Sequence, residues 1–199
     1  MKRILFLLAA AAVLLPAQTL DHHDREFGMS ALHASRKLFL DSVAGLSPAQ
    51  WNYKPSPTSW SIAECAEHIA LSEEYLFQLA TQKVLRTPAA PEKAAGVKGR
   101  EEMVLKVLPA RDHKVQAPEP LKPSGRWKTP EEAVAAFKRL RDQHIAYLEK
   151  TEDPLRVHFM ESPVGLLDAY QWILYMSAHT ERHVNQILEV KASPGYPKQ

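Results

Sequence analysis

Residues 60–79 read WSIAECAEHIALSEEYLFQL, the pattern of an amphipathic helix that begins at a strong cap. Ser61 and Glu64 form the S-x-x-E pair in which each side chain binds the other residue's backbone N–H at a helix start. Apolar side chains then recur every three or four residues, which places them on one face of a helix. The pattern predicts a helix from Ser61 to about Leu85. Its buried stripe would contain Ile62, Cys65, Ile69, Leu76 and Leu79.

Three further stretches carry helical patterns with recognisable start and stop signals. They predict helices over residues 21–46, over residues 129–150, and from residues 163–166 to about residue 191. Helices of about 20 to 28 residues are about 30 to 40 Å long, a length typical of four-helix bundles. No short stretch alternates apolar and polar side chains convincingly, so a sheet is not expected. The predicted fold class is therefore all-α, with four long helices in a bundle.

A long connection separates the second predicted helix from the third. Residues 86–128 contain six prolines, and a connection of this length in a compact domain is either functional or loosely ordered. Residues 101–108 could form a short helix within it, packed across one end of the bundle. The sequence thus predicts a four-helix bundle with a long crossover between helices 2 and 3.

The start of the chain has the three parts of a secretory signal peptide. Lys2 and Arg3 precede twelve apolar residues, Ile4 to Leu15, and Pro16-Ala17 follows. The apolar run is too short to span a bilayer, which takes about 20 residues. We expect a signal peptide over residues 1–17, a single domain over residues 18–199, and a periplasmic or secreted protein. No later stretch is apolar for long enough to predict membrane association after cleavage.

Composition and charge exclude several classes of protein. The 199 residues are 45% apolar and 24% charged, as in ordinary folded proteins. Without Lys2 and Arg3 the chain carries 23 basic and 23 acidic residues, so it lacks the positive charge typical of nucleic-acid-binding proteins. Cys65 is the only cysteine, which excludes an intramolecular disulfide and favours a small buried apolar side chain.

The placement of nine histidines is the main chemical signal. His179 and His183 lie four residues apart in AHTERHVNQI, residues 178–187, so both imidazoles can converge on one ion. When two histidines with this spacing occur alone, one ring more often caps a helix or packs in the core while the other faces water. The stretch also lacks the Glu of the zinc-protease motif HExxH. A third imidazole changes this balance, because His68 lies on the second helix, which can face the fourth across a bundle. Three neutral imidazoles would leave one position open on zinc or a similar ion.

Other histidines could replace one of these. His68 could instead be a core residue that donates to a backbone carbonyl. His144 shares a stripe with apolar residues of the third helix and is the rival third ligand, and His33 in the first helix is a weaker one. The remaining histidines fall in termini or loops, where we expect them to be solvated: His22, His23, His113 and His158.

Residues near these histidines have two interpretations each. Glu64 lies one turn before His68 and could orient that ring or take a proton from bound water, although the capping box already explains it. Gln186 could bind a ligand ring or a substrate, or it could join two helices. Arg182 could hold an acidic substrate or be a solvated charge. Three large side chains one to two turns before His179 would line a pocket or simply belong to the core: Trp172, Tyr175 and Met176.

Together these residues resemble the DinB-like superfamily of metal-dependent enzymes. The resemblance rests on Trp60, Ser61, Ile62, Ala63, Glu64 and His68, followed about 110 residues later by His179, Arg182, His183, Gln186 and Ile187. In that family, W-S/T-x-x-E-x-x-x-H supplies one ligand and H-x-x-x-H with a following Q-I supplies two. The resemblance implies a four-helix bundle, a zinc or nickel ion held by His68, His179 and His183, and frequent homodimers. Better-understood members use cytoplasmic low-molecular-weight thiols such as bacillithiol or mycothiol.

The sequence leaves two functions open. The first is a metal-dependent hydrolase or group transferase that acts on a small molecule. The second is a non-catalytic helical module that binds a metal or a small molecule. No activated serine, cysteine or carboxylate pair is evident beside the histidines, so the residues alone do not choose between them.

Overall fold

The computed structural model describes residues 19–112 and 115–198. The predicted signal peptide, residues 1–17, and His113 lie outside the described residues. Within the described ranges, no helix has the combination of length and apolar character that crossing a bilayer requires.

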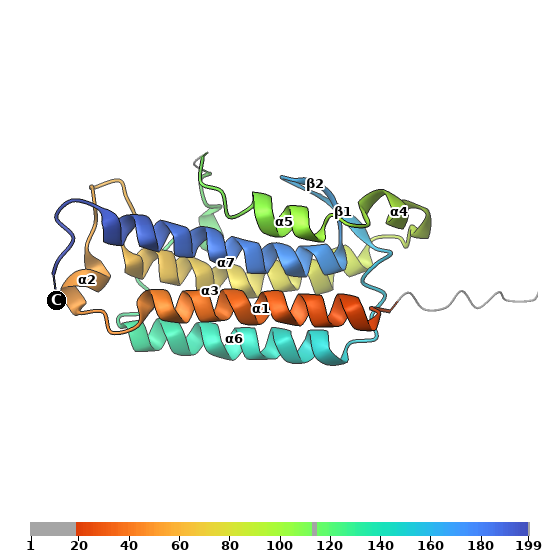
Figure 1. Cartoon of the computed structure of the whole chain (residues 1–199), viewed down its shortest axis with the longest axis horizontal. Helices are drawn as coiled ribbons and strands as arrows, with labels where there is room; N and C mark the ends of the chain where they lie inside the picture. Colours follow the sequence, from red (N-terminus) through yellow and green to blue (C-terminus); the bar gives the residue numbers. More distant parts are fainter. Residues whose placement is uncertain (1–18, 113–114, 199) are drawn as a thin grey trace, which may run out of the picture.

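Four long helices dominate the structure and lie side by side (Figure 1). They are α1 (His22–Val43), α3 (Ile62–Gln78), α6 (Pro130–Lys150) and α7 (Ala169–Ala192). The first of them packs against α6 and α7, and α3 packs against the same two helices. The mostly helical structure agrees with the predicted all-α class.

The helix starts follow from their capping residues. Ser61 Oγ accepts from Glu64 N, and the Glu64 carboxylate accepts from Ser61 N, so the predicted capping box is present. Thr129 caps α6 in the predicted place. Beyond Gln78 the second long helix continues as a π-helical turn, η1 (Leu79–Lys83), and a 3-10 turn, η2 (Val84–Arg86). The predicted end near Leu85 is therefore correct in extent, although the last turns are not α-helical.

A small β-hairpin corrects two predictions. Strands β1 (Phe159–Ser162) and β2 (Gly165–Asp168) pair antiparallel, so the expectation of no sheet is wrong for this segment. Gly165 has a φ of 97°, a conformation that glycine adopts without a steric penalty, and this permits the tight turn. The last helix accordingly begins at Ala169 instead of residues 163–166, because the Asp168 side chain caps it in a box with Gln171. Four-residue strands are too short to show clear alternation in the sequence.

The remaining elements are short. The predicted helix at residues 101–108 is present as α5 (Glu101–Val107), but it lies alongside α7 instead of across an end (Figure 1). The other short helices are α2 (Pro48–Asn52), which precedes α3, and three in the long connection before α6: η3 (Pro91–Lys93), α4 (Ala94–Val97) and η4 (Glu119–Leu121).

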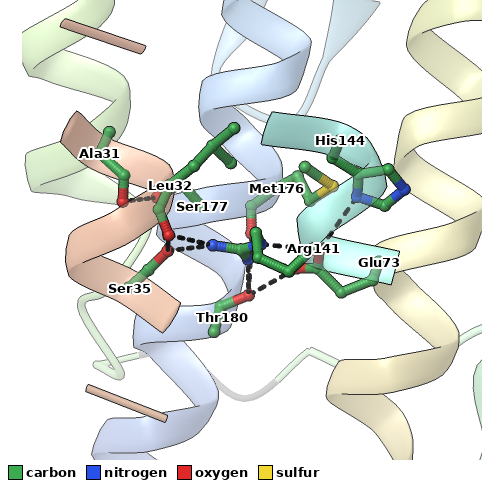
Figure 2. Close-up of polar contacts among 9 residues, drawn as sticks. All are labelled: Ala31, Leu32, Ser35, Glu73, Arg141, His144, Met176, Ser177 and Thr180. Carbon is green, nitrogen blue, oxygen red and sulfur yellow. Dashed lines mark hydrogen bonds and ion pairs between the residues drawn. The ribbon is translucent and has the colours of Figure 1, made fainter. Parts of the chain in front are cut away.

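A polar layer separates two apolar clusters in the core. The cluster near the hairpin includes Leu32, Leu148 and Tyr170, and the other includes Phe39 and Phe137. Between them along the four long helices lie buried polar side chains, drawn in Figure 2: Ser35, Glu73, Arg141, His144, Ser177 and Thr180. The three histidines of greatest interest lie where α3 and α7 pack together beside this layer.

Candidate metal centre

His68, His179 and His183 meet in space. The packing of α3 against α7 brings the ring centroids of His68 and His183 to 4.4 Å, those of His179 and His183 to 4.6 Å, and those of His68 and His179 to 5.1 Å. One ring nitrogen of each lies within 4.8 Å of the other two. Within residues 19–112 and 115–198, this is the one group of three or more His, Cys, Asp or Glu side chains arranged closely enough to hold a metal ion. Their role as ligands remains a prediction.

The protonated nitrogen of His68 follows from its hydrogen bond. Nδ1 lies 2.8 Å from the carbonyl oxygen of Leu121. A carbonyl oxygen only accepts, so Nδ1 carries the hydrogen and the lone pair is on Nε2. Donation to a backbone carbonyl was the competing interpretation of His68, and the structure shows that it leaves the ring fit for ligation. Metal-binding histidines usually donate their other ring N–H in this way.

His183 is oriented by Gln186. The Gln186 Oε1 atom accepts from His183 Nδ1 at 2.9 Å and from Arg111 Nη1 at 3.2 Å. Because a guanidinium only donates, its contact identifies the glutamine atom as the oxygen, and His183 Nδ1 must then carry a hydrogen. Gln186 thus binds a histidine ring, one of the two predicted roles. The contribution of Arg111 had no counterpart in the sequence pattern, because it comes from the long connection.

Burial keeps the three rings neutral. His68 and His183 are buried and His179 is half-buried. Desolvation, followed by the nearby His68, lowers the pKa of His179 to about 3. Desolvation and the other two rings lower the pKa of His183 well below its usual value, and desolvation lowers that of His68 despite the bond to Leu121. Neutral imidazoles are the form that binds metal ions.

Aromatic side chains flank the three rings. The Trp60 ring centroid lies 5.0 Å from that of His68 and 6.1 Å from that of His183. Tyr175 stacks beside His179 at 6.5 Å. Trp172 packs against Tyr175, and Met176 is buried in the core. Of the three predicted pocket residues, Tyr175 therefore has a ring beside the cluster. Sequence reasoning missed the contact of Trp60 with the histidines, although its place beside the Ser61 cap could have indicated it.

The rival histidines lie elsewhere. His33 is exposed on α1. His144 is buried with Glu73, whose Oε2 lies 3.2 Å from His144 Nδ1, and its ring stacks on Phe77. Neither belongs to the group formed by the three rings. His22 and His23 are exposed as expected, whereas His158 is half-buried, and its Nδ1 donates to the Thr87 carbonyl oxygen, which corrects its assignment as solvated.

Two charged neighbours have structural partners. The Glu64 carboxylate accepts from Ser61 N and from Lys54 Nζ, so its capping role is confirmed. Arg182 donates to the backbone carbonyl oxygens of Leu108 and Ala110, which ties α7 to the long connection. Arg182 is half-buried, so it is only partly solvated.

Cys65 also has a structural environment. It is fully buried, and desolvation raises the pKa of its thiol, so the side chain stays protonated. This confirms the prediction of a small buried apolar residue.

Two comparisons with known proteins found similar sequences. The family model of the DinB superfamily matches residues 31–187, a range that contains all three histidines. The chain is 31% identical over 166 residues, 82% of its length, to an uncharacterized protein of Bacillus subtilis (strain 168), YuaE, and covers 96% of that protein. No solved structure matches.

Proposed function

Because the chain belongs to the DinB superfamily, we propose that it binds a divalent ion, zinc or nickel, through His68, His179 and His183. The observation that carries the proposal is the orientation of the rings. His68 and His183 each donate Nδ1–H to a fixed oxygen, so their Nε2 lone pairs are available to an ion. We take α1, α3, α6 and α7 to form the four-helix bundle expected of this family.

The donor set fits such an ion. Imidazole nitrogens suit both zinc and nickel. Nitrogens bound to one tetrahedral ion at about 2.0 to 2.1 Å lie about 3.4 Å apart. The three here lie within 4.8 Å of one another, so ring movements of about an ångström bring them together. Burial adds to the fit, because neutral rings need no proton loss before they bind.

We propose metal-dependent hydrolysis or group transfer on a small molecule as the activity. When bound, the ion would lower the pKa of a water molecule toward about 7 or polarise an oxygen or sulfur of the substrate. Trp60 and Tyr175 would shield the site, and half-buried His179 marks the side that solvent reaches. Export to the periplasm or beyond and assembly into a homodimer remain predictions from the sequence.

A non-catalytic binding module is the second candidate. It is favoured by one observation: among the described residues, the group of potential ligands contains no carboxylate or thiol that could serve as a base beside the ion. Metal-loaded protein should be screened with ester, amide and thiol-transfer substrates. Turnover that disappears with a chelator supports the enzyme, and bound metal without turnover on any class supports the module.

Metal analysis of protein purified without chelators tests the binding itself. We expect about one zinc or nickel ion per wild-type chain, and loss of the ion in His68→Ala and His183→Ala with the helical circular dichroism retained. His33→Ala is the matched control, because this histidine is exposed on α1, and it should keep the full metal content. A full complement of metal in either ligand variant would contradict the assignment.

A further inference from the structure

Glu67 binds one loop through four hydrogen bonds. Its Oε1 accepts from Ser124 N at 2.8 Å and from Ser124 Oγ at 3.0 Å, and its Oε2 accepts from Gly125 N at 2.8 Å and from Arg126 N at 3.1 Å. Only 3% of Glu67 is exposed. Each oxygen of this buried carboxylate accepts two hydrogen bonds from residues 124–126, which makes it a strong anchor between α3 and that loop.

The loop is shaped to receive a carboxylate. Gly125 has a φ of 76°, in the left-handed region that side chains disfavour. A positive-φ residue within a turn can point successive backbone N–H groups to one side, where they bind an anion. Here three successive N–H groups, from Ser124 to Arg126, bind the two oxygens of Glu67.

The same segment contains the hydrogen-bond partner of His68. Leu121, whose carbonyl oxygen accepts from His68 Nδ1, lies three residues before Ser124 and is itself buried. Two neighbouring residues of α3, Glu67 and His68, therefore bind this segment at two points. Only Lys122 and Pro123 separate the two points, so we expect a shift of residues 124–126 away from Glu67 to move the Leu121 carbonyl relative to the His68 ring.

We infer that Glu67 is a positioning residue for His68. By holding residues 124–126, it holds the Leu121 carbonyl against Nδ1, which fixes the hydrogen there and keeps Nε2 as the nitrogen with the lone pair. This statement concerns the metal-free protein and does not depend on the ion. Its consequence for metal affinity rests on the proposed function.

The tautomer of His68 tests the inference directly. Ring ¹⁵N chemical shifts of metal-free wild-type protein should show the hydrogen on Nδ1. Glu67→Gln replaces one acceptor oxygen by an amide NH₂ that faces backbone donors, so the loop is released and we expect the Nε2–H tautomer of His68 to rise at least several-fold. A purely structural anchor would change the stability without changing this tautomer.

A second variant protects the test against misfolding of α3. Gly125→Ala strains the loop at its positive φ while leaving every helix residue unchanged. We expect the same change of tautomer. The matched control is Glu119→Gln. Glu119 lies two residues before Leu121, is exposed and pairs with Lys122. Nδ1–H that stays fully populated in both Glu67→Gln and Gly125→Ala would overturn the inference.

Zinc titration provides the second measurement. Loss of a partner that orients a ligand typically weakens metal binding about 10- to 100-fold, and we expect this for Glu67→Gln but not for Glu119→Gln. Weaker binding without a change of tautomer would overturn the route through Leu121. If wild-type protein binds no zinc or nickel, the proposed function fails, and the tautomer measurement still decides the role of Glu67.

Discussion

Two buried clusters place histidine beside different neighbours, a charged pair in one and two further imidazoles in the other. His144 lies in the polar layer of Figure 2, where Glu73 accepts from it and from Arg141. Arg141 uses all five of its N–H groups, through contacts with Glu73, Thr180, Leu32 O and Ser35. The metal-centre candidate has neutral rings, and among the described residues no hydrogen bond occupies the Nε2 atoms of His68 and His183.

The difference distinguishes a structural cluster from the candidate metal centre. Glu73 and Arg141 connect all four long helices and satisfy each other's charge. In the three-histidine cluster, the Nδ1 donors of His68 and His183 are satisfied, and within the described part of the chain their Nε2 atoms have no hydrogen-bond partner. The Nε2 atoms of His68 and His183 are therefore available to an ion, as the proposed function requires.

The largest effect should come from breaking the Glu73–Arg141 pair. Glu73→Leu or Arg141→Met leaves one buried charge without its partner, which typically costs about 3 to 5 kcal/mol of the free energy of unfolding. The double variant should recover more than half of that loss, because neither charge remains. Urea unfolding of the four proteins in a double-mutant cycle measures the coupling.

A surface pair supplies the control for this cycle. Arg36 and Asp142 also join two of the long helices, at 2.6 Å, but Asp142 is 55% exposed. Loss of this ion pair should reduce the free energy of unfolding by about 1 kcal/mol or less, because exposed ion pairs are screened by water and salt. Single variants of Glu73 and Arg141 that cost no more than this pair would show that the cluster does not hold the helices together.

Acid should destabilise the two clusters in different pH ranges. The pKa of His179 is lowered to about 3, so between pH 6.5 and about 3 the unfolded chain binds a proton that the folded chain excludes, and stability falls as the pH falls. At pH 5 this one ring should cost about 2 kcal/mol in metal-free protein. Burial raises the pKa of Glu73, but the Arg141 guanidinium outweighs it and lowers this pKa to about 2. The contribution of Glu73 to the free energy of unfolding is therefore lost only below pH 4.5.

Unfolding of chelator-treated protein at several pH values tests this separation. His179→Gln should remove most of the about 2 kcal/mol that this ring costs between pH 7 and pH 5. The loss of stability below pH 4.5 should stay in place. An unchanged slope between pH 7 and pH 5 would mean that the His179 ring is not held neutral by its surroundings.

Residue types along the helices predicted much of this arrangement, because helix geometry alone relates their positions. The cap at Ser61 and the four-residue spacing of His179 and His183 are local signals. The partner of His68 is a backbone carbonyl in a distant loop, and any residue at position 121 could supply it. Glu73 and Arg141 are residue types usually found in water, so only their tertiary packing reveals them as core.

Gln186→Leu tests whether orientation of a ring matters to the metal centre. It removes the oxygen that accepts from His183 Nδ1 while keeping a side chain of similar size. We expect about tenfold weaker zinc binding, roughly 1.4 kcal/mol, with ordinary folding. Gln143→Leu on α6 is the control, because Gln143 is exposed. Equal affinities for the two variants would show that the hydrogen bond to Gln186 contributes nothing to binding.

The smallest effect is expected at Glu64, which lies one helical turn before His68. Glu64→Gln keeps the capping box, since glutamine also serves at this position, and loses the partly exposed ion pair with Lys54. Stability should fall by about 1 kcal/mol at most, and zinc affinity should stay within about twofold. If zinc affinity instead falls tenfold, Glu64 acts on His68 as well as on the helix start. The metal centre would then contain a carboxylate beside a histidine, as the Glu73–His144 cluster does.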